Sequence, residues 1–209
     1  MNDIFNGKTV LFQGDSVTDV GRREREHGWG YARKVFEVYT SLMPSSTVKF
    51  VNRGIGGDRT IHLLNRYEED FLAVKPDFIS ILIGINDAWS AIDNAADAVK
   101  AEVYENNYRI LLEKIRDDLP DAGIIILEPF LLPISGLNPN WRPVLDPRIQ
   151  IARKLAREFA DYYLPLDGIL GGYAVSGYPA SAISEDGVHP TDLGHGLIAY
   201  EWLKATEIL

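Results

Sequence analysis

The sequence predicts a single-domain α/β fold over residues 1–209, a three-layer αβα sandwich with a doubly wound parallel sheet of about five strands. Three observations predict it. Short apolar runs of strand length alternate with longer segments whose apolar residues recur at helical spacing. The run 78–83 (FISILI) is almost uninterruptedly apolar, which is typical of a central parallel strand covered on both faces. A chain of 209 residues suits one well-buried domain and is short for two.

Five segments have the length and apolar character of strands. The last of them contains Pro165, which cannot donate to a central ladder and therefore indicates an edge strand. The expected strands are 9–12, 48–52, 78–83, 124–127 and 164–167.

The segments between these strands carry helical patterns, several of them closed by a proline. The expected helices are 28–43, 59–74, 95–119, 146–162 and 191–207. Three further segments read as irregular. We expect 17–27 to be a solvated loop, 168–184 to be a glycine-rich connector with at most one helical turn, and 128–145, with its four prolines, to be a loop on the substrate side.

Composition narrows the classes of partner. The net charge of −9 argues against a nucleic acid or an anionic lipid surface, since basic patches meet those partners. No apolar run approaches the ~20 residues of a membrane span. The absence of cysteine excludes disulfides, thiolate metal sites and a cysteine nucleophile. The N-terminal residues show no export signal, which predicts a cytoplasmic protein. No motif indicates a cofactor, because Gly7-Lys8-Thr9 precedes its strand, whereas a phosphate-binding loop follows one.

Ser16 is the candidate nucleophile. It follows the first expected strand and the sharp turn that Gly14 permits, at the sheet edge where α/β proteins bind ligands. A serine hydroxyl needs a base, and the base needs an acceptor that fixes its tautomer. Asp186 and His189, three residues apart in a turn near the other end of the chain, can supply both. The sequence therefore predicts a Ser-His-Asp triad.

Two other strand ends reach the same edge. The glycine loop 54–57 follows the second expected strand, and Asn86 follows the third. The backbone N–H groups of Ser16 and Gly57 and the Asn86 amide could stabilise the negative charge that develops on an ester carbonyl. Gly54 and Gly56 lie in the same loop, and Gly57 is preferred because it directly precedes an acidic residue.

These residues carry a resemblance to a known family. The segments Gly14-Asp15-Ser16, Gly56-Gly57-Asp58, Gly84-Ile85-Asn86-Asp87 and Asp186-Gly187-Val188-His189-Pro190 resemble, in order, the four signature blocks of the SGNH (GDSL-like) esterases and lipases. The sequence around these blocks is most similar to that of bacterial carbohydrate O-acetylesterases such as acetylxylan esterases. The resemblance implies a flavodoxin-like SGNH hydrolase fold, no cofactor, and the same roles for Ser16, Gly57, Asn86, Asp186 and His189. It is also compatible with a homo-oligomer, which no residue here indicates.

Aromatic side chains are the candidates for substrate binding. Trp89, Trp141 and Tyr178 lie in or next to loops that could border the site, and aromatic faces suit sugar rings and acyl chains alike. Asp15 is grouped with them because it adjoins the nucleophile, although a carboxylate there is expected to accept N–H bonds of its own loop. The other histidines, His27, His62 and His195, are expected to be structural.

The residues predict a serine carboxylic ester hydrolase with an acyl-enzyme intermediate. The resemblance implies that it removes acetyl groups from a carbohydrate, with a small-molecule or oligosaccharide ester as substrate. A general short-chain carboxylesterase or lysophospholipase would use the same residues. A metal-dependent hydrolase built on Asp15, Asp19, Asp186 and His189 is a different class, and a non-catalytic sugar-binding protein is another. Fold class alone does not choose among them.

Overall fold

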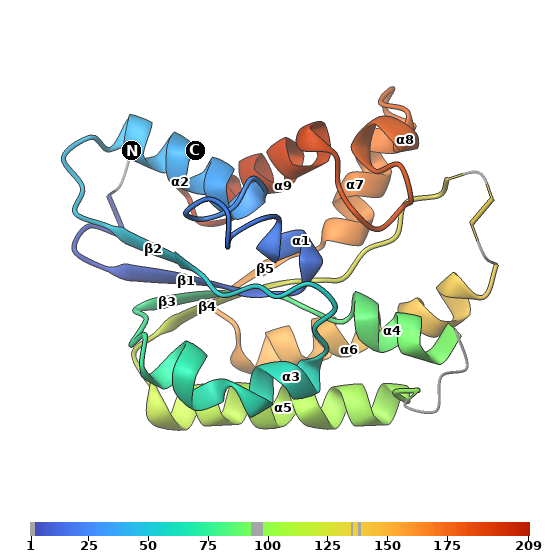
Figure 1. The fold of residues 1–209 in the computed structure, drawn as a ribbon, viewed down its shortest axis with the longest axis horizontal. Coiled ribbons are helices and arrows are strands. Elements are labelled where there is room, and N and C mark those ends of the chain that lie inside the picture. The colour runs from blue at the N-terminus through green and yellow to red at the C-terminus, as the bar shows by residue number, and fades with distance from the viewer. Residues whose placement is uncertain (1–2, 93–97, 135, 138) are drawn as a thin grey trace.

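Five parallel strands form one sheet in the order β2-β1-β3-β4-β5 (Figure 1). The structure is a computed structural model and describes residues 3–92, 98–134, 136–137 and 139–209. The strands are β1 (Thr9–Gly14), β2 (Lys49–Asn52), β3 (Phe78–Leu82), β4 (Gly123–Leu127) and β5 (Tyr162–Leu164). The chain moves from β1 outward to β2 and then back across to β3. The crevice that forms where such an order reverses, between the ends of β1 and β3, is the usual ligand site of this topology.

Helices cover both faces of the sheet (Figure 1). One face carries α1 (Ser16–Asp19), α2 (Tyr31–Leu42), α7 (Leu166–Val175), α8 (Ala180–Ile183) and α9 (Asp192–Ala205). The other carries α3 (Thr60–Asn65), the π-helical turn η1 (Glu68–Leu72), α5 (Ala101–Asp118) and α6 (Trp141–Phe159). Helix α4 (Ile85–Ile92) starts three residues after β3 ends and lies beyond the carboxyl edge of the sheet. None of the helices in the described part of the chain has the length and apolar character needed to span a membrane.

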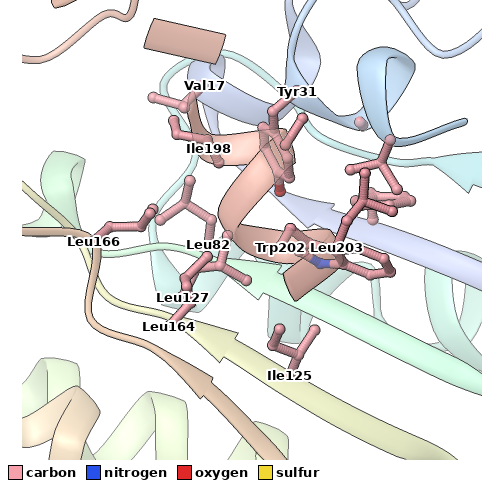
Figure 2. Packing of buried hydrophobic residues seen from close by; sticks show 14 of the residues in the cluster. Val17, Tyr31, Leu82, Ile125, Leu127, Leu164, Leu166, Ile198, Trp202 and Leu203 are labelled. Carbon is pink, nitrogen blue, oxygen red and sulfur yellow. The ribbon is translucent and has the colours of Figure 1, made fainter. Parts of the chain in front are cut away.

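The side chains of each strand alternate between two cores. Val10 and Phe12 of β1 belong to the core under α2 and α9, whereas Leu11 belongs to the core under α3, α5 and α6. Trp202 of α9 is fully buried at the centre of the first core (Figure 2) and donates its indole N–H to Ser80 Oγ of β3 at 3.1 Å. This bond satisfies two polar groups that would otherwise be costly to bury.

The predicted α/β fold and its five-stranded parallel sheet are confirmed, with four strands within about two residues of the predicted bounds. The fifth prediction, 164–167, is wrong in its bounds, because β5 ends at Leu164 and α7 follows. The prediction that 168–184 is a connector with at most one helical turn is wrong as well, because α7 and α8 occupy most of it. Leu166 and Leu170 recur at helical spacing and pack into the core, and this burial outweighs the low helix propensity of three glycines.

Other helix bounds also differ from the predictions. The helix expected over 59–74 divides into α3 and η1, and α4 was not predicted. Helix α5 begins at Ala101, and the predicted start at Ala95 lies outside the described residues. Helix α6 begins at Trp141 instead of 146, which shortens the predicted loop 128–145. Pro143 fits its first turn because the N–H groups there have no partner within a helix. The loop expected over 17–27 begins with residues of α1, where Val17 is buried in the core.

Candidate active site

The turn after β1 places Ser16 at the crevice. Gly14 ends β1, and a Cβ atom at that position would clash with the Leu82 carbonyl oxygen of β3, so the close approach of the two strand ends requires glycine. Asp15 caps α1 by accepting the Val17 N–H at 3.0 Å and is almost completely buried. Burial raises the pKa of Asp15 to about 7, although the Val17 N–H opposes the rise.

The turn before α9 brings Asp186 and His189 to the same place. An antiparallel bridge between Ser184 and Pro190 closes this loop. Asp186 Oδ1 accepts the backbone N–H groups of Val188 at 2.9 Å and of His189 at 2.7 Å. Asp186 Oδ2 lies 2.6 Å from His189 Nδ1, and His189 Nε2 lies 3.0 Å from Ser16 Oγ. Three side chains from opposite ends of the sequence therefore form one hydrogen-bonded chain.

The charge on Asp186 sets the imidazole tautomer. Burial acts to raise the pKa of Asp186, but the hydrogen bonds from the His189 ring and from two backbone N–H groups outweigh it and lower the pKa to about 2. The carboxylate is thus ionised near neutral pH and accepts a proton-bearing Nδ1. His189 Nε2 is then the unprotonated nitrogen, which can accept the Ser16 hydroxyl proton.

The glycine loop offers one N–H group to the crevice. Two other glycines of the loop use theirs, since Gly54 N–H donates to Asn52 Oδ1 at 2.9 Å and Gly56 N–H donates to Asp19 Oδ2 at 3.0 Å. Gly57 has a left-handed φ of 83°, and its N–H makes no hydrogen bond to any of the described residues. Among the three glycines, Gly57 therefore has the available donor.

Asn86 lies in the first turn of α4, across from the glycine loop. Its Nδ2 donates one hydrogen to the Asp58 carbonyl oxygen at 3.0 Å, and the amide has a second hydrogen to offer. The next residue, Asp87, is buried and accepts the Thr60 hydroxyl at 2.8 Å and the Thr60 backbone N–H at 3.2 Å. These contacts attach the start of α4 to the start of α3.

An open cavity of about 540 Å³ lies between the Ser16 turn, the glycine loop, the start of α4 and His189. Five predicted site residues line it, namely Ser16, Gly57, Asn86, Trp89 and His189. Trp89 belongs to α4 and is 37% exposed. The remaining lining residues are Arg59, His62 and Ser90, which the sequence analysis did not place in the site. Arg59 and His62 follow the glycine loop within five residues, and Ser90 lies one helical turn after Asn86, so these positions are the signal that could have indicated them.

The structure separates the other predicted substrate contacts from this cavity. Trp141 is buried at the start of α6 and supports Trp89 in an edge-to-face contact with 5.2 Å between ring centroids. Tyr178 packs edge-on against Tyr173 at the end of α7, and neither ring lines the cavity. Asp15 is buried and is not a lining residue either.

The surroundings of His195 and the grouping of acidic and histidine side chains are relevant to two further expectations, a structural His195 and a metal site. His195 is buried in α9, where its Nδ1 accepts the Tyr31 N–H at the start of α2 at 3.2 Å, and burial lowers its pKa to about 4. This geometry is that of a helix cap. Over residues 3–92, 98–134, 136–137 and 139–209, no three or more His, Asp or Glu side chains are grouped so as to hold a metal ion.

Comparisons with known proteins agree with this geometry. Residues 12–197 match the model of the GDSL-like lipase/acylhydrolase family. The chain is 32% identical to an acetylxylan esterase from Geobacillus stearothermophilus, over 96% of this chain and 94% of that protein. A GDSL-like lipase structure from Parabacteroides merdae superposes with a TM-score of 0.92 at 34% identity, covering 99% of both chains.

The structure of the Geobacillus acetylxylan esterase superposes with a TM-score of 0.86 at 30% identity, covering 98% of this chain and 96% of that one. Catalytic mutants of that esterase replace a serine, an aspartate or a histidine by alanine. The family match covers most of the sequence and both signature ends of the site. The chain therefore belongs to the GDSL-like lipase/acylhydrolase family and is a carboxylic ester hydrolase.

Proposed function

We propose that this esterase removes acetyl groups from a carbohydrate with Ser16 as nucleophile, His189 as base and Asp186 as the orienting carboxylate. The observation that carries the proposal is the continuous hydrogen-bonded chain from Ser16 Oγ through both ring nitrogens of His189 to Asp186. Each distance lies within the range over which a triad transfers a proton.

In the first half of the reaction, Ser16 Oγ attacks the acetyl carbonyl carbon and its proton moves to His189 Nε2. The Asp186 carboxylate stabilises the imidazolium that forms. The tetrahedral intermediate then collapses, the bond to the alcohol oxygen breaks, and His189 returns the proton to the departing sugar hydroxyl. The product is an acetyl ester of Ser16.

In the second half, water replaces the sugar. His189 Nε2 takes a proton from the water as it attacks the acetyl ester. The second tetrahedral intermediate then collapses, the bond to Ser16 Oγ breaks, and His189 returns the proton to Ser16 Oγ as acetate leaves. Both halves develop negative charge on the same carbonyl oxygen. The Gly57 N–H, the second Asn86 amide hydrogen and the Ser16 N–H are the donors that would stabilise it, and fixed donors of this kind are often the largest contribution to the rate.

The choice of a carbohydrate acetyl ester has two supports. The named acetylxylan esterase is similar over nearly the full length of both chains. The exposed Trp89 ring lines the cavity and packs against Trp141, and an aromatic side chain at a cavity suits a sugar ring. A short-chain carboxylesterase or lysophospholipase would use the same triad and differ in the alcohol and acyl chain.

The test compares native protein and Ser16→Ala on p-nitrophenyl acetate, an acetylated xylo-oligosaccharide and a lysophospholipid, each with and without a chelator. We expect Ser16→Ala to lose both acetylesterase activities, the chelator to have no effect, and the oligosaccharide to exceed the lysophospholipid in kcat/KM. Native-level turnover by Ser16→Ala would refute the triad. Loss of activity with chelator would instead favour a metal-dependent hydrolase. Turnover of p-nitrophenyl acetate but not of the oligosaccharide would overturn the proposed substrate.

A further inference from the structure

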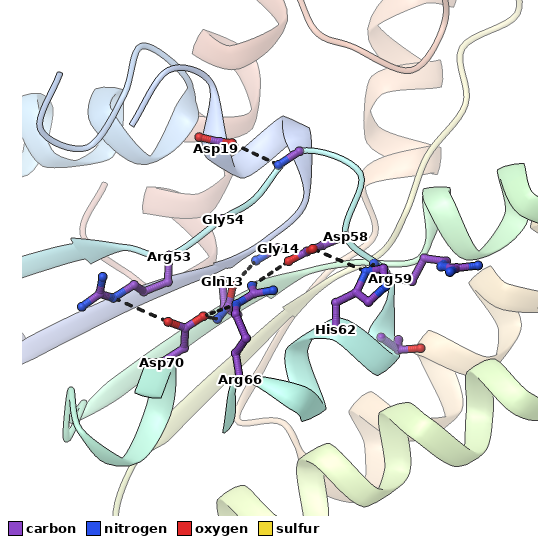
Figure 3. A network of polar contacts seen from close by, with 12 residues as sticks. Gln13, Gly14, Asp19, Arg53, Gly54, Asp58, Arg59, His62, Arg66 and Asp70 are labelled. Atoms are coloured by element: carbon purple, nitrogen blue, oxygen red, sulfur yellow. Dashed lines mark hydrogen bonds and ion pairs between the residues drawn. The ribbon is translucent and has the colours of Figure 1, made fainter. Parts of the chain in front are cut away.

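A network of buried charges lies behind the glycine loop (Figure 3). Arg66, which follows the last residue of α3, contacts two carboxylates. Its Nη2 lies 2.6 Å from Asp58 Oδ2, and its Nε lies 2.9 Å from Asp70 Oδ2. Both aspartates are buried, with 6% and 4% of their surface exposed. The planar guanidinium can hold two carboxylates in one orientation, whereas an ammonium acts as a point charge.

The first carboxylate, that of Asp58, belongs to a residue that contacts both Gly57 and Asn86. Asp58 directly follows Gly57 in the chain, and its own carbonyl oxygen accepts the Asn86 amide at 3.0 Å. Fixing the Asp58 side chain therefore restrains the peptide unit beside the Gly57 N–H and also the acceptor that orients Asn86. The ion pair between Arg66 and Asp58 thus restrains two proposed oxyanion donors, the Gly57 N–H and the Asn86 amide.

The second carboxylate leads to the nucleophile. Asp70 Oδ2 accepts Gln13 Nε2 at 3.1 Å, and Gln13 Oε1 accepts the Gly14 N–H at 3.0 Å. Gln13 is completely buried, and Gly14 is the turn residue two positions before Ser16. Figure 3 shows Arg66 between Asp58 and Asp70, with Gln13 and Gly14 next to Asp70. The same guanidinium is therefore connected to the loop that carries the donors and to the turn that carries Ser16.

We propose that Arg66 is a positioning residue for catalysis, which holds Gly57 and Asn86 at a fixed place relative to Ser16 through Asp58, Asp70 and Gln13. This inference rests on the proposed function of Ser16 and its donors. Arg66 does not line the cavity, so it acts on the transition state only through the residues it holds. Since both acylation and deacylation develop the oxyanion, kcat reports on this positioning whichever step limits turnover.

The test is a double-mutant cycle of Arg66→Met and Asn86→Ala, with p-nitrophenyl acetate as substrate and Ser16→Ala as the reference for loss of the serine mechanism. Removing an oxyanion donor costs about 10²–10³ in kcat, and we expect Arg66→Met alone to cost roughly 10–100-fold with KM within about threefold. In the Asn86→Ala background the same change should cost clearly less than it does alone, because one of the two donors that Arg66 positions is already missing and only Gly57 remains.

Arg53→Met is the matched control. Arg53 approaches Asp70 only to 3.8 Å, is 39% exposed in its side chain and contacts Asp70 but not Asp58 in the structure, so its loss should leave kcat within about twofold. Arg66→Lys keeps the charge without the fork and should lower kcat to an intermediate value. If Arg66→Met does not fold, Arg66→Lys takes its place in the cycle.

The outcomes separate the two proposals. Full activity of Ser16→Ala would refute the proposed function. An inactive Ser16→Ala together with a folded Arg66→Met of native kcat would overturn only the role of Arg66. Equal losses from the Arg66 substitution with and without Asn86 would overturn the proposed joint restraint of Gly57 and Asn86, because additivity would show that Arg66 does not act through Asn86.

Discussion

The two halves of the site are held in place in different ways. Asp186 and His189 lie on the loop 184–190, their side chains are 51% and 47% exposed, and Asp186 bonds to groups within three residues of itself. Gly57 and Asn86, in contrast, adjoin buried carboxylates that contact other elements: Asp87 accepts the Thr60 hydroxyl from 27 residues away, and Asp58 contacts Arg66 at the end of α3. The half with the proposed acid–base pair is thus a local structure, and the half with the proposed donors is assembled by tertiary contacts.

This difference predicts that the two halves respond oppositely to mutation. A local, exposed loop can lose a side chain with little effect on folding, although the reaction loses its base. A substitution in the half with buried contacts should lower both the activity and the free energy of unfolding, because it leaves a buried polar group unpaired. Paired measurements of kcat and Tm therefore distinguish the halves.

The largest expected effect is that of His189→Ala, which should lower kcat for p-nitrophenyl acetate by about 10⁴-fold or more. Its Tm should stay within about 3 °C of the native value, because the exposed ring contacts Ser16 and its own loop. Differential scanning fluorimetry and initial rates measure both. A Tm lowered by 10 °C or so would show that this half is not local.

Asn86→Ala should have a smaller effect on the rate and a larger one on stability. We expect kcat to fall about 10²–10³-fold, since one oxyanion donor is lost. The Asp58 carbonyl also loses its hydrogen bond, worth about 1 kcal/mol, which should lower Tm by roughly 2–4 °C. If kcat fell as far as in His189→Ala, the amide would have a role beyond that of a donor.

Thr60→Val tests the connection between α3 and α4 without touching the cavity. It removes the hydroxyl that donates to the buried Asp87, which should cost about 1–3 kcal/mol in the free energy of unfolding. The matched control is Thr47→Val, whose exposed hydroxyl donates to Asn6 and should contribute less than about 0.5 kcal/mol. Urea titrations of both variants give the comparison. Equal midpoints would contradict a structural role for the Asp87 contact.

A pH dependence of opposite sign is expected for the two carboxylates of the site. The pKa of Asp15 rises from 3.8 to about 7 on folding, so the native state binds more protons between these values, and stability falls as pH rises through 7. The pKa of Asp186 falls from 3.8 to about 2, so its contribution is fully present above pH 4 and is lost only as pH falls toward 2.

The Tm of Asp15→Asn relative to native protein should therefore increase between pH 5 and pH 8, whereas that of Asp186→Asn should stay constant over the same range. Fluorimetry in a constant-ionic-strength buffer series measures both differences. Parallel curves for the two variants would contradict the contrast between a buried and an exposed carboxylate.

The same difference explains which parts of the site the sequence revealed. Asp186 and His189 are three positions apart, and Ser16 follows a recognisable strand, so local pattern was enough to find them. The contact between Gln13 and Asp70 joins residues 57 positions apart, and no local pattern predicts it. Trp141 was expected beside the substrate because four prolines suggested a loop, but α6 extends to Trp141 and buries it behind Trp89.

Secondary structure was predictable where periodicity and burial agreed. All five strands are short, and four of them lie within about two residues of their predicted bounds, whereas the fifth shares only Leu164 with its prediction. Helix α7 was missed because its three glycines argued against a helix, and only packing of Leu166 and Leu170 against the core decides in its favour. Its existence depends on neighbours that the segment itself does not contain.

The first and second turns of helix α4 make different contacts. Asn86 in the first turn is fixed to the glycine loop, whereas Trp89 and Ser90 in the second turn face the cavity. A substitution at Trp89 is expected to alter the cavity lining and to leave the contacts of Asn86 and Asp87 in place. If Trp89 contacts the substrate as proposed, natural variation or laboratory selection could change substrate preference there, one helical turn away from the proposed chemistry.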